Sequence, residues 1–111
     1  MSQGNIFMEQ LIHKIVKELK AKISEKYELR DIRIFGSSAR GDRRKDSDID
    51  VFVQLPQVDR SIEEDLFDIA YELELKYDYL LDLIIFSDEA LKGLYSRTPI
   101  YQNILVEGKV V

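Results

Sequence analysis

Three short runs of β-branched and aromatic residues, set between longer amphipathic segments, constrain the fold more than any other feature of this sequence. The first run covers residues 31–35 and stops at Gly36, the second covers residues 48–55 and stops at Pro56, and the third covers residues 80–86. Runs of this composition, bounded by glycine or proline, are typical of β-strands. Gly36 can adopt backbone angles that other residues avoid, so we expect a sharp turn there.

The segments between these runs have the spacing of amphipathic helices. Apolar residues recur every three or four positions from residue 7 to about 26, and again over residues 61–77. His13, the only histidine, falls among the polar positions of the first segment, and we expect it at the surface. The second segment carries six carboxylates that lie mostly off its apolar stripe, for which we expect a solvated face: Glu63, Glu64, Asp65, Asp68, Glu72 and Glu74.

Local signals predict where three of the helices begin. Ser61, with a glutamate three residues later, has the pattern of a capping box, in which each side chain satisfies a backbone amide that the helix start leaves unpaired. Ser87 is expected to cap a short helix. Thr98 followed by Pro99 predicts the start of a last helix, and Gly108 predicts its end.

The order helix, strand, turn, strand, helix, strand, helix predicts an α+β fold with a small mixed β-sheet flanked by helices. A chain of 111 residues is long enough for one core, and we expect residues 1–111 to form a single domain. The third strand, apolar at nearly every position, is expected to be buried on both faces. Such a chain leaves little room for a separate substrate domain, so a large substrate would be recognised partly by something outside this domain.

Composition narrows the function. The chain has no cysteine, which excludes disulfides and thiolate metal sites, and no run approaches the roughly 20 apolar residues of a membrane span. We therefore expect a cytoplasmic protein that does not bind membranes. The formal net charge of -5 argues against general nucleic-acid binding, which depends on basic residues that neutralise phosphates.

The segment after the first strand has the residues of a phosphate site. Gly36 would let the backbone approach a ligand closely, and the first amides of a following helix are free donors at a partial positive charge. Ser37 adds a hydroxyl donor and Arg40 a fixed charge. We assign phosphate binding to Gly36, Ser37, Ser38 and Arg40. A solvated charged loop, which also contains Arg43, Arg44 and Lys45, is the alternative.

Asp48 and Asp50 lie two positions apart on the second strand, so their side chains are expected on the same side, with backbones about 7 Å apart. Like charges held this close need a cation between them, and carboxylate oxygens suit Mg²⁺ or Mn²⁺. Pairing of the two aspartates with Arg43 or Arg44 is the alternative.

Asp82 interrupts the apolar third run. An unpaired carboxylate buried in such a strand would cost several kcal/mol, so the sequence predicts that Asp82 faces a cation or a network of donors. If its strand lies beside the strand of Asp48, three carboxylates converge on one point. Two metal ions acting on a phosphoryl group require such a cluster.

These residues together resemble a known family. Gly36-Ser37, ten intervening residues and then Asp48-x-Asp50 resemble the signature of the DNA polymerase β-like nucleotidyltransferase superfamily. The small size and the Gly-Ser-x-Ala-Arg-Gly form at residues 36–41 are similar to the minimal nucleotidyltransferases. The resemblance implies a polymerase β-like fold and transfer of a nucleoside monophosphate, with AMP from ATP expected. It also implies that Asp48, Asp50 and Asp82 are catalytic and bind two Mg²⁺ ions, while Gly36 and Ser37 hold the β and γ phosphates.

The resemblance also suggests a partner. Minimal nucleotidyltransferases are often encoded beside a small helical HEPN-domain protein and act as antitoxins by adding AMP to it. We therefore expect a protein side chain as acceptor, with contact surfaces at Leu94-Tyr95 or at Tyr101 and Gln102. Two alternatives remain: a non-catalytic module that neutralises its partner by occlusion, and an enzyme that modifies a small molecule such as an aminoglycoside.

Overall fold

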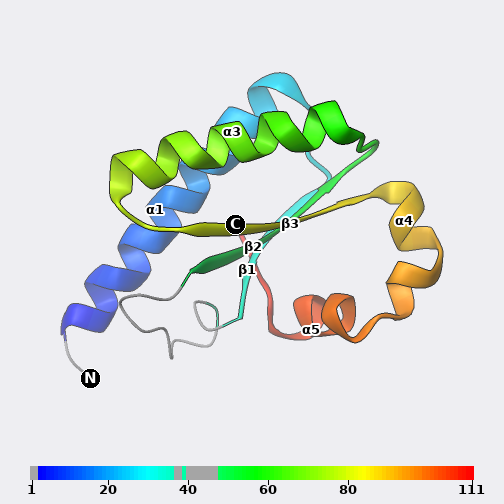
Figure 1. Ribbon diagram of the computed structural model, residues 1–111. Helices are drawn as coiled ribbons and strands as arrows, with labels where there is room; N and C mark the ends of the chain where they lie inside the picture. Colours follow the sequence, from blue (N-terminus) through cyan, green and yellow to red (C-terminus); the bar gives the residue numbers. More distant parts are fainter. Residues whose placement is uncertain (1–2, 37–38, 40–47) are drawn as a thin grey trace.

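The computed structural model describes residues 3–36, 39 and 48–111 (Figure 1). In these ranges the elements are α1 (Gln3–Lys26), β1 (Asp31–Phe35), β2 (Ile49–Leu55), α3 (Arg60–Tyr77), β3 (Leu81–Ser87), α4 (Asp88–Lys92), the short 3₁₀ helix η1 (Leu94–Arg97), α5 (Pro99–Glu107) and β4 (Lys109–Val110). The predicted α+β order is confirmed, and η1 and β4 are additions to it. None of the helices in the described part of the chain combines the length and apolar character needed to cross a membrane.

The strands form a mixed sheet in the order β3-β2-β1-β4. β1 pairs antiparallel with β2 and with β4, while β2 pairs parallel with β3. Figure 1 shows α1 and α3 together on one side of this sheet and α5 on the other. The predicted small mixed sheet flanked by helices is therefore correct.

Side chains alternate across β2, and this alternation separates the core from the opposite face. Ile49, Val51 and Val53 are fully buried and belong to the cluster that also contains α1 and α3 residues. Phe52 lies on the opposite face, where its ring centroid is 5.8 Å from that of Tyr101 in α5. Each fully buried side chain of this size stabilises the fold by about 1.5–3 kcal/mol. Buried side chains on both faces of β2 thus stabilise the sheet.

The start of α3 differs from the sequence prediction. Asp59 caps this helix from an extended conformation, and its carboxylate accepts a hydrogen bond of 2.8 Å from the amide of Ile62. Ser61 is consequently a residue of the first turn, and the prediction that it caps the helix is wrong. The aspartate is two residues earlier and is one of the strongest capping residue types.

The other two predicted starts are confirmed. The Ser87 hydroxyl accepts a hydrogen bond of 3.1 Å from the amide of Ala90, and α5 begins at Pro99 directly after Thr98. The hydroxyl of Thr98 donates to the Tyr95 carbonyl rather than capping α5. Gly108 follows the end of α5, as predicted.

β3 does not have the predicted burial. Leu83 is buried, while the other apolar residues of the strand are only partly covered. The reason is topological, because β3 lies at the edge of the described sheet and pairs there with β2 alone. Its apolar run therefore reflects contacts with α3 and with the aromatic side chains beyond it, such as the contact of Phe86 with Tyr95 at 5.3 Å between ring centroids.

Two carboxylates connect α1 to α3 at separate points. Glu18 accepts hydrogen bonds from the ammonium of Lys76 at 2.7 Å and from the Tyr77 hydroxyl at 2.5 Å. Asp65 accepts a hydrogen bond of 2.6 Å from the Tyr27 hydroxyl. The bond from Lys76, followed by that from Tyr77, lowers the pKa of Glu18, and the bond from Tyr27 is the main cause that lowers the pKa of Asp65. Both carboxylates favour the folded chain when they are ionised.

These connections predict acid-dependent stability. Because the folded-state pKa of each carboxyl lies below its unfolded value of 4.5 for Glu18 and 3.8 for Asp65, the unfolded chain binds more protons on acidification. The stabilisation is present above those values and is lost as the pH falls through the lower folded-state pKa. We expect the urea midpoint of unfolding to fall as the pH is lowered through these pKa values, and to fall less steeply in Glu18→Gln. Glu25→Gln, at an exposed carboxylate of the same helix, is the control, and an equally steep decline in Glu18→Gln would contradict the assignment.

Candidate active site

Asp50 and Asp82 are register partners on the parallel strands β2 and β3. Neighbouring strands lie about 4.8 Å apart, and residues paired in register project to the same face of a sheet. A hydrogen bond of 2.8 Å from the amide of Ile49 to the carbonyl of Leu80 sets this register at the start of both strands. The strand of Asp82 thus lies beside that of Asp50, which is the condition on which the predicted convergence depends, and two carboxylates lie side by side on one face.

The predicted burial of Asp82, in contrast, is wrong. Its side chain is exposed, because β3 lies at the edge of the sheet that the described residues form. The cost of burying a charge therefore does not explain this residue, and its place beside Asp50 follows from strand pairing alone.

Glu74 fixes the position of the strand that carries Asp82. Its carboxylate accepts a hydrogen bond of 2.8 Å from the amide of Leu81, the residue before Asp82, and so connects the end of α3 to the beginning of β3. The prediction of a solvated face is therefore wrong for Glu74 and for Asp65, both of which are half-buried and hydrogen-bonded. No sequence pattern identifies Glu74, because the bond depends on how the chain turns after α3.

Gly36 lies against the Asp50 carboxylate of this pair. Phe35 pairs with Asp50 across β1 and β2, so the chain leaves β1 directly beside the aspartate. Gly36 has a φ of +68°, and a Cβ added there would overlap Asp50 Oδ2 and lie 3.2 Å from its Cγ. The backbone angles thus favour glycine at this position, and a larger residue would also displace the Asp50 carboxylate.

The remaining predicted site residues divide into two groups. Asp48 directly precedes β2 and is exposed. The residues predicted to bind phosphate beside Gly36, namely Ser37, Ser38 and Arg40, lie outside the described residues, as do Arg43, Arg44 and Lys45. Within the described ranges, which include all three aspartates, no three carboxylate or imidazole side chains are grouped so that they could hold a metal ion. The convergence of Asp48 with Asp50 and Asp82 is thus not seen in this structure, and their binding of metal stays a prediction.

The chemistry of the paired carboxylates fits a divalent cation. Asp50 and Asp82 project from adjacent strands to one face, where their like charges repel unless a cation or a donor lies near them. Carboxylate oxygens are the ligands that Mg²⁺ and Mn²⁺ prefer. The backbone of Gly36 approaches the Asp50 carboxylate closely and places no side chain over it.

A polar cavity of about 720 Å³ lies at the opposite end of the same sheet face. There the Asp88 carboxylate accepts hydrogen bonds from Gln54 at 2.9 Å and from Arg30 at 3.0 Å, and Arg33 pairs with Asp31 at 2.8 Å. The Gln54 amide, followed by the Arg30 guanidinium, lowers the pKa of Asp88. These contacts hold the first residue of α4 to β2 and to the residue before β1, far from Asp82 along β3.

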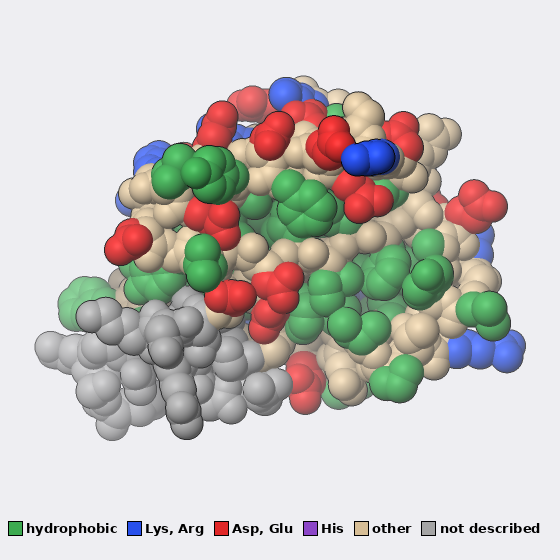
Figure 2. Space-filling model, viewed as in Figure 1, with side chains coloured by type: hydrophobic (Ala, Val, Ile, Leu, Met, Phe, Trp, Pro, Cys, Tyr) green, Lys and Arg blue, Asp and Glu red, His purple; other side chains and the backbone are tan. Residues whose placement is uncertain are grey.

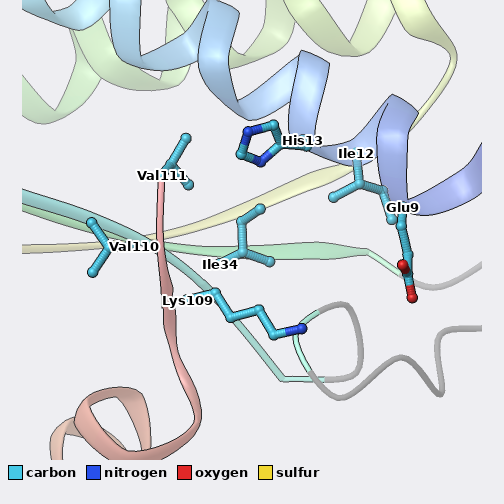
Figure 3. Close-up of a pocket in the computed structure, with 7 residues that line it drawn as sticks. All are labelled: Glu9, Ile12, His13, Ile34, Lys109, Val110 and Val111. Atoms are coloured by element: carbon cyan, nitrogen blue, oxygen red, sulfur yellow. The ribbon is translucent and has the colours of Figure 1, made fainter. Parts of the chain in front are cut away.

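A smaller cavity of about 250 Å³ lies between α1 and β4. Figure 3 shows its lining, in which the Lys109 side chain extends along the sheet below Ile34, its register partner. His13 belongs to this lining from the exposed side of α1, as predicted for a surface residue. Neither cavity includes Asp50 or Asp82.

A mixed sheet that places paired aspartates beside a left-handed glycine turn defines a class of domain suited to bind and transfer phosphorylated groups. The nucleotidyltransferase domain model matches residues 15–110. The chain therefore belongs to the nucleotidyltransferase domain family and is a nucleotidyltransferase, as its resemblance implied.

Sequence relatives refine this class. A protein of Methanocaldococcus jannaschii, provisionally named a protein adenylyltransferase, is 32% identical over 103 residues, covering 93% of this chain and 96% of the relative. The protein adenylyltransferase MntA of Thermococcus cleftensis is 26% identical over 95 residues, covering 86% and 92%.

Solved structures agree with the fold. A toxin–antitoxin complex with AMP-PNP contains a chain that matches with a TM-score of 0.63 and 27% identity, covering 89% of this chain and 70% of that one. A chain in the complex of tri-AMPylated Shewanella oneidensis HEPN toxin with its MNT antitoxin matches with a TM-score of 0.55 and 26% identity, covering 92% and 70%. The predicted likeness to minimal nucleotidyltransferases is confirmed.

Proposed function

We propose that this nucleotidyltransferase transfers AMP from ATP to a hydroxyl group on a protein, and that it depends on a divalent metal bound by Asp48, Asp50 and Asp82. The observation that carries the proposal is the register pairing of Asp50 with Asp82, directly beside the turn at Gly36. This pairing brings the two carboxylates together with the turn that is expected to hold phosphates.

The site residues would have different roles in the proposed reaction. Gly36, Ser37, Ser38 and Arg40 would hold the triphosphate of ATP, and the three aspartates would hold Mg²⁺ or Mn²⁺. When bound, two such ions stabilise the charge on the phosphates and on the leaving pyrophosphate. Asp82 orients the acceptor hydroxyl and takes up its proton. The acceptor oxygen then bonds to the α phosphorus, whose bond to the bridging oxygen breaks in line.

The relatives support a protein acceptor, and specifically a HEPN-type partner. The sequence relatives are named protein adenylyltransferases, and one structural neighbour is in complex with a HEPN toxin that carries AMP. A second neighbour is a toxin–antitoxin complex with AMP-PNP, which supports an adenine nucleotide. The rival function, neutralisation by occlusion, would leave the partner unmodified. Modification of a small molecule would leave no role for a protein partner.

Intact mass spectrometry distinguishes these functions. We expect a HEPN-type protein encoded beside this chain to gain the mass of one or more AMP units when it is incubated with this chain, ATP and Mg²⁺. The gain should disappear in excess EDTA and in Asp48→Asn. A stable complex without any gain in mass would support occlusion and contradict the proposal.

A further inference from the structure

Large apolar side chains form an exposed stripe along α3. Phe67, Tyr71 and Leu75 follow one another at intervals of four residues, which places them on one face of the helix, and they are 47%, 59% and 68% exposed. Leu80, between α3 and β3, is 59% exposed. These four residues are the α3 stripe. Apolar side chains of this size that gather on a surface commonly mark a binding site.

The α3 stripe leads to Asp82. Leu80 lies two residues before that aspartate, and Glu74, the neighbour of Leu75, is bonded to the amide of Leu81. In Figure 2 the green apolar side chains lie among red carboxylates over α3, and the strand at the open edge of the described sheet crosses directly below them in the same view in Figure 1. Asp82, like its partner Asp50, projects to the face of the sheet away from α3, but β3 lies at the edge of the described sheet. A molecule bound on the stripe would therefore reach the carboxylate proposed to orient the acceptor by extending past this edge.

The surroundings of the stripe are acidic. The two basic residues of α3 are paired, Arg60 with Glu64 and Lys76 with Glu18. Exposed carboxylates surround the apolar residues along the helix and at its end: Glu63, Glu64, Asp68, Glu72 and Asp78. This rim disfavours nucleic acid and anionic lipid, which both carry negative charge, and it would repel a second copy of the same surface. It favours a protein that presents apolar side chains with lysines and arginines around them.

We propose that the α3 stripe is the docking surface for the acceptor protein, and that binding there delivers the acceptor hydroxyl to Asp82. This inference rests on the proposed transfer to a protein and adds where that protein binds. The α3 stripe replaces the predicted surface at Leu94 and Tyr95. Both residues are exposed, but they follow the far end of β3. There Ser87 pairs with Leu55, whereas Asp82 at the other end pairs with Asp50. A buried apolar centre with a charged rim is the usual anatomy of a protein interface.

Steady-state kinetics with the HEPN-type acceptor test the proposal. We expect Leu75→Lys and Tyr71→Ser each to raise KM for the acceptor about tenfold or more, since central interface residues carry most of the binding energy. The kcat at saturating acceptor and the affinity for AMP-PNP should stay at wild-type values. Leu94→Lys is the matched control, because Leu94 is 86% exposed and lies away from Asp82. All three sites are exposed, and circular dichroism verifies folding.

Charge reversal provides a second, independent measurement. Glu72→Lys should raise KM for the acceptor, whereas Glu89→Lys, on α4, should leave it unchanged. If the wild-type chain transfers AMP and the Leu75, Tyr71 and Glu72 variants keep the wild-type KM, the docking surface is wrong and the proposed function stands. If the wild-type chain transfers no AMP to the acceptor, the proposed function itself is wrong.

Discussion

Asp50→Asn is expected to reduce AMP transfer by about 10²–10³-fold, the usual size of the effect when one preorganised electrostatic contact is removed. Asparagine keeps the shape of the side chain but removes the charge that lies beside Asp82 and Gly36. Because the residue is only half-buried, the free energy of unfolding should change by less than about 1 kcal/mol. Transfer of radiolabelled AMP and urea unfolding measure the two quantities.

The control for this variant is Asp59→Asn, the same chemical change at a distant carboxylate. Asparagine caps a helix about as well as aspartate, so the bond to the amide of Ile62 should persist and both stability and transfer should stay near wild type. Undiminished transfer by Asp50→Asn would show that the aspartate pair is not part of the active site. A loss of transfer in both variants would show that the assay responds to stability instead.

Gly36→Ala is expected to affect both stability and transfer. A non-glycine residue in the left-handed region costs about 1–3 kcal/mol, and here the added Cβ would also overlap the Asp50 carboxylate. The collision has to be relieved by moving either the turn or the aspartate. We therefore expect a lower urea midpoint together with a loss of transfer of about tenfold or more, since a displaced catalytic group of this kind can cost about 10²-fold.

Gly93→Ala is the matched control for that prediction. Gly93 has a φ of -102°, and the nearest atoms to an added Cβ are backbone carbonyl oxygens at 3.9 and 4.0 Å. The new methyl group therefore meets ordinary contacts, and stability should change by less than about 0.5 kcal/mol. Equal losses in both glycine variants would contradict the proposed role of the Gly36 turn.

Sequence patterns predicted the parts of the site that are local. The alternation along residues 31–35 and 49–55 determines which side chains of β1 and β2 enter the core, so both strands and the turn at Gly36 could be recognised. Asp48 and Asp50 lie two positions apart, Asp48 directly before β2 and Asp50 within it, so their spacing is known from the sequence. The same reasoning could not establish that Asp82 pairs with Asp50, because register between distant strands depends on how the intervening helix packs.

Burial and capping were harder to predict for similar reasons. The apolar run that contains Leu83 has the composition of a central strand, and its place at the edge depends on the whole topology. Asp59 and Ser61 both have capping side chains, and only the backbone conformation decides between them. β4 is two residues long and becomes a strand only because Ile34 and Arg33 lie beside it.

The position of β3 also matters for solubility. An edge strand presents unpaired backbone groups that can add strands from other molecules, and charged residues on such strands discourage this pairing. Asp82 is exposed on β3, and the amide of the preceding Leu81 is already bonded to Glu74. The exposed charge of Asp82 and the bond from the Leu81 amide to Glu74 are therefore expected to discourage strand addition at this edge, a role that is separate from the one proposed for Asp82 in transfer.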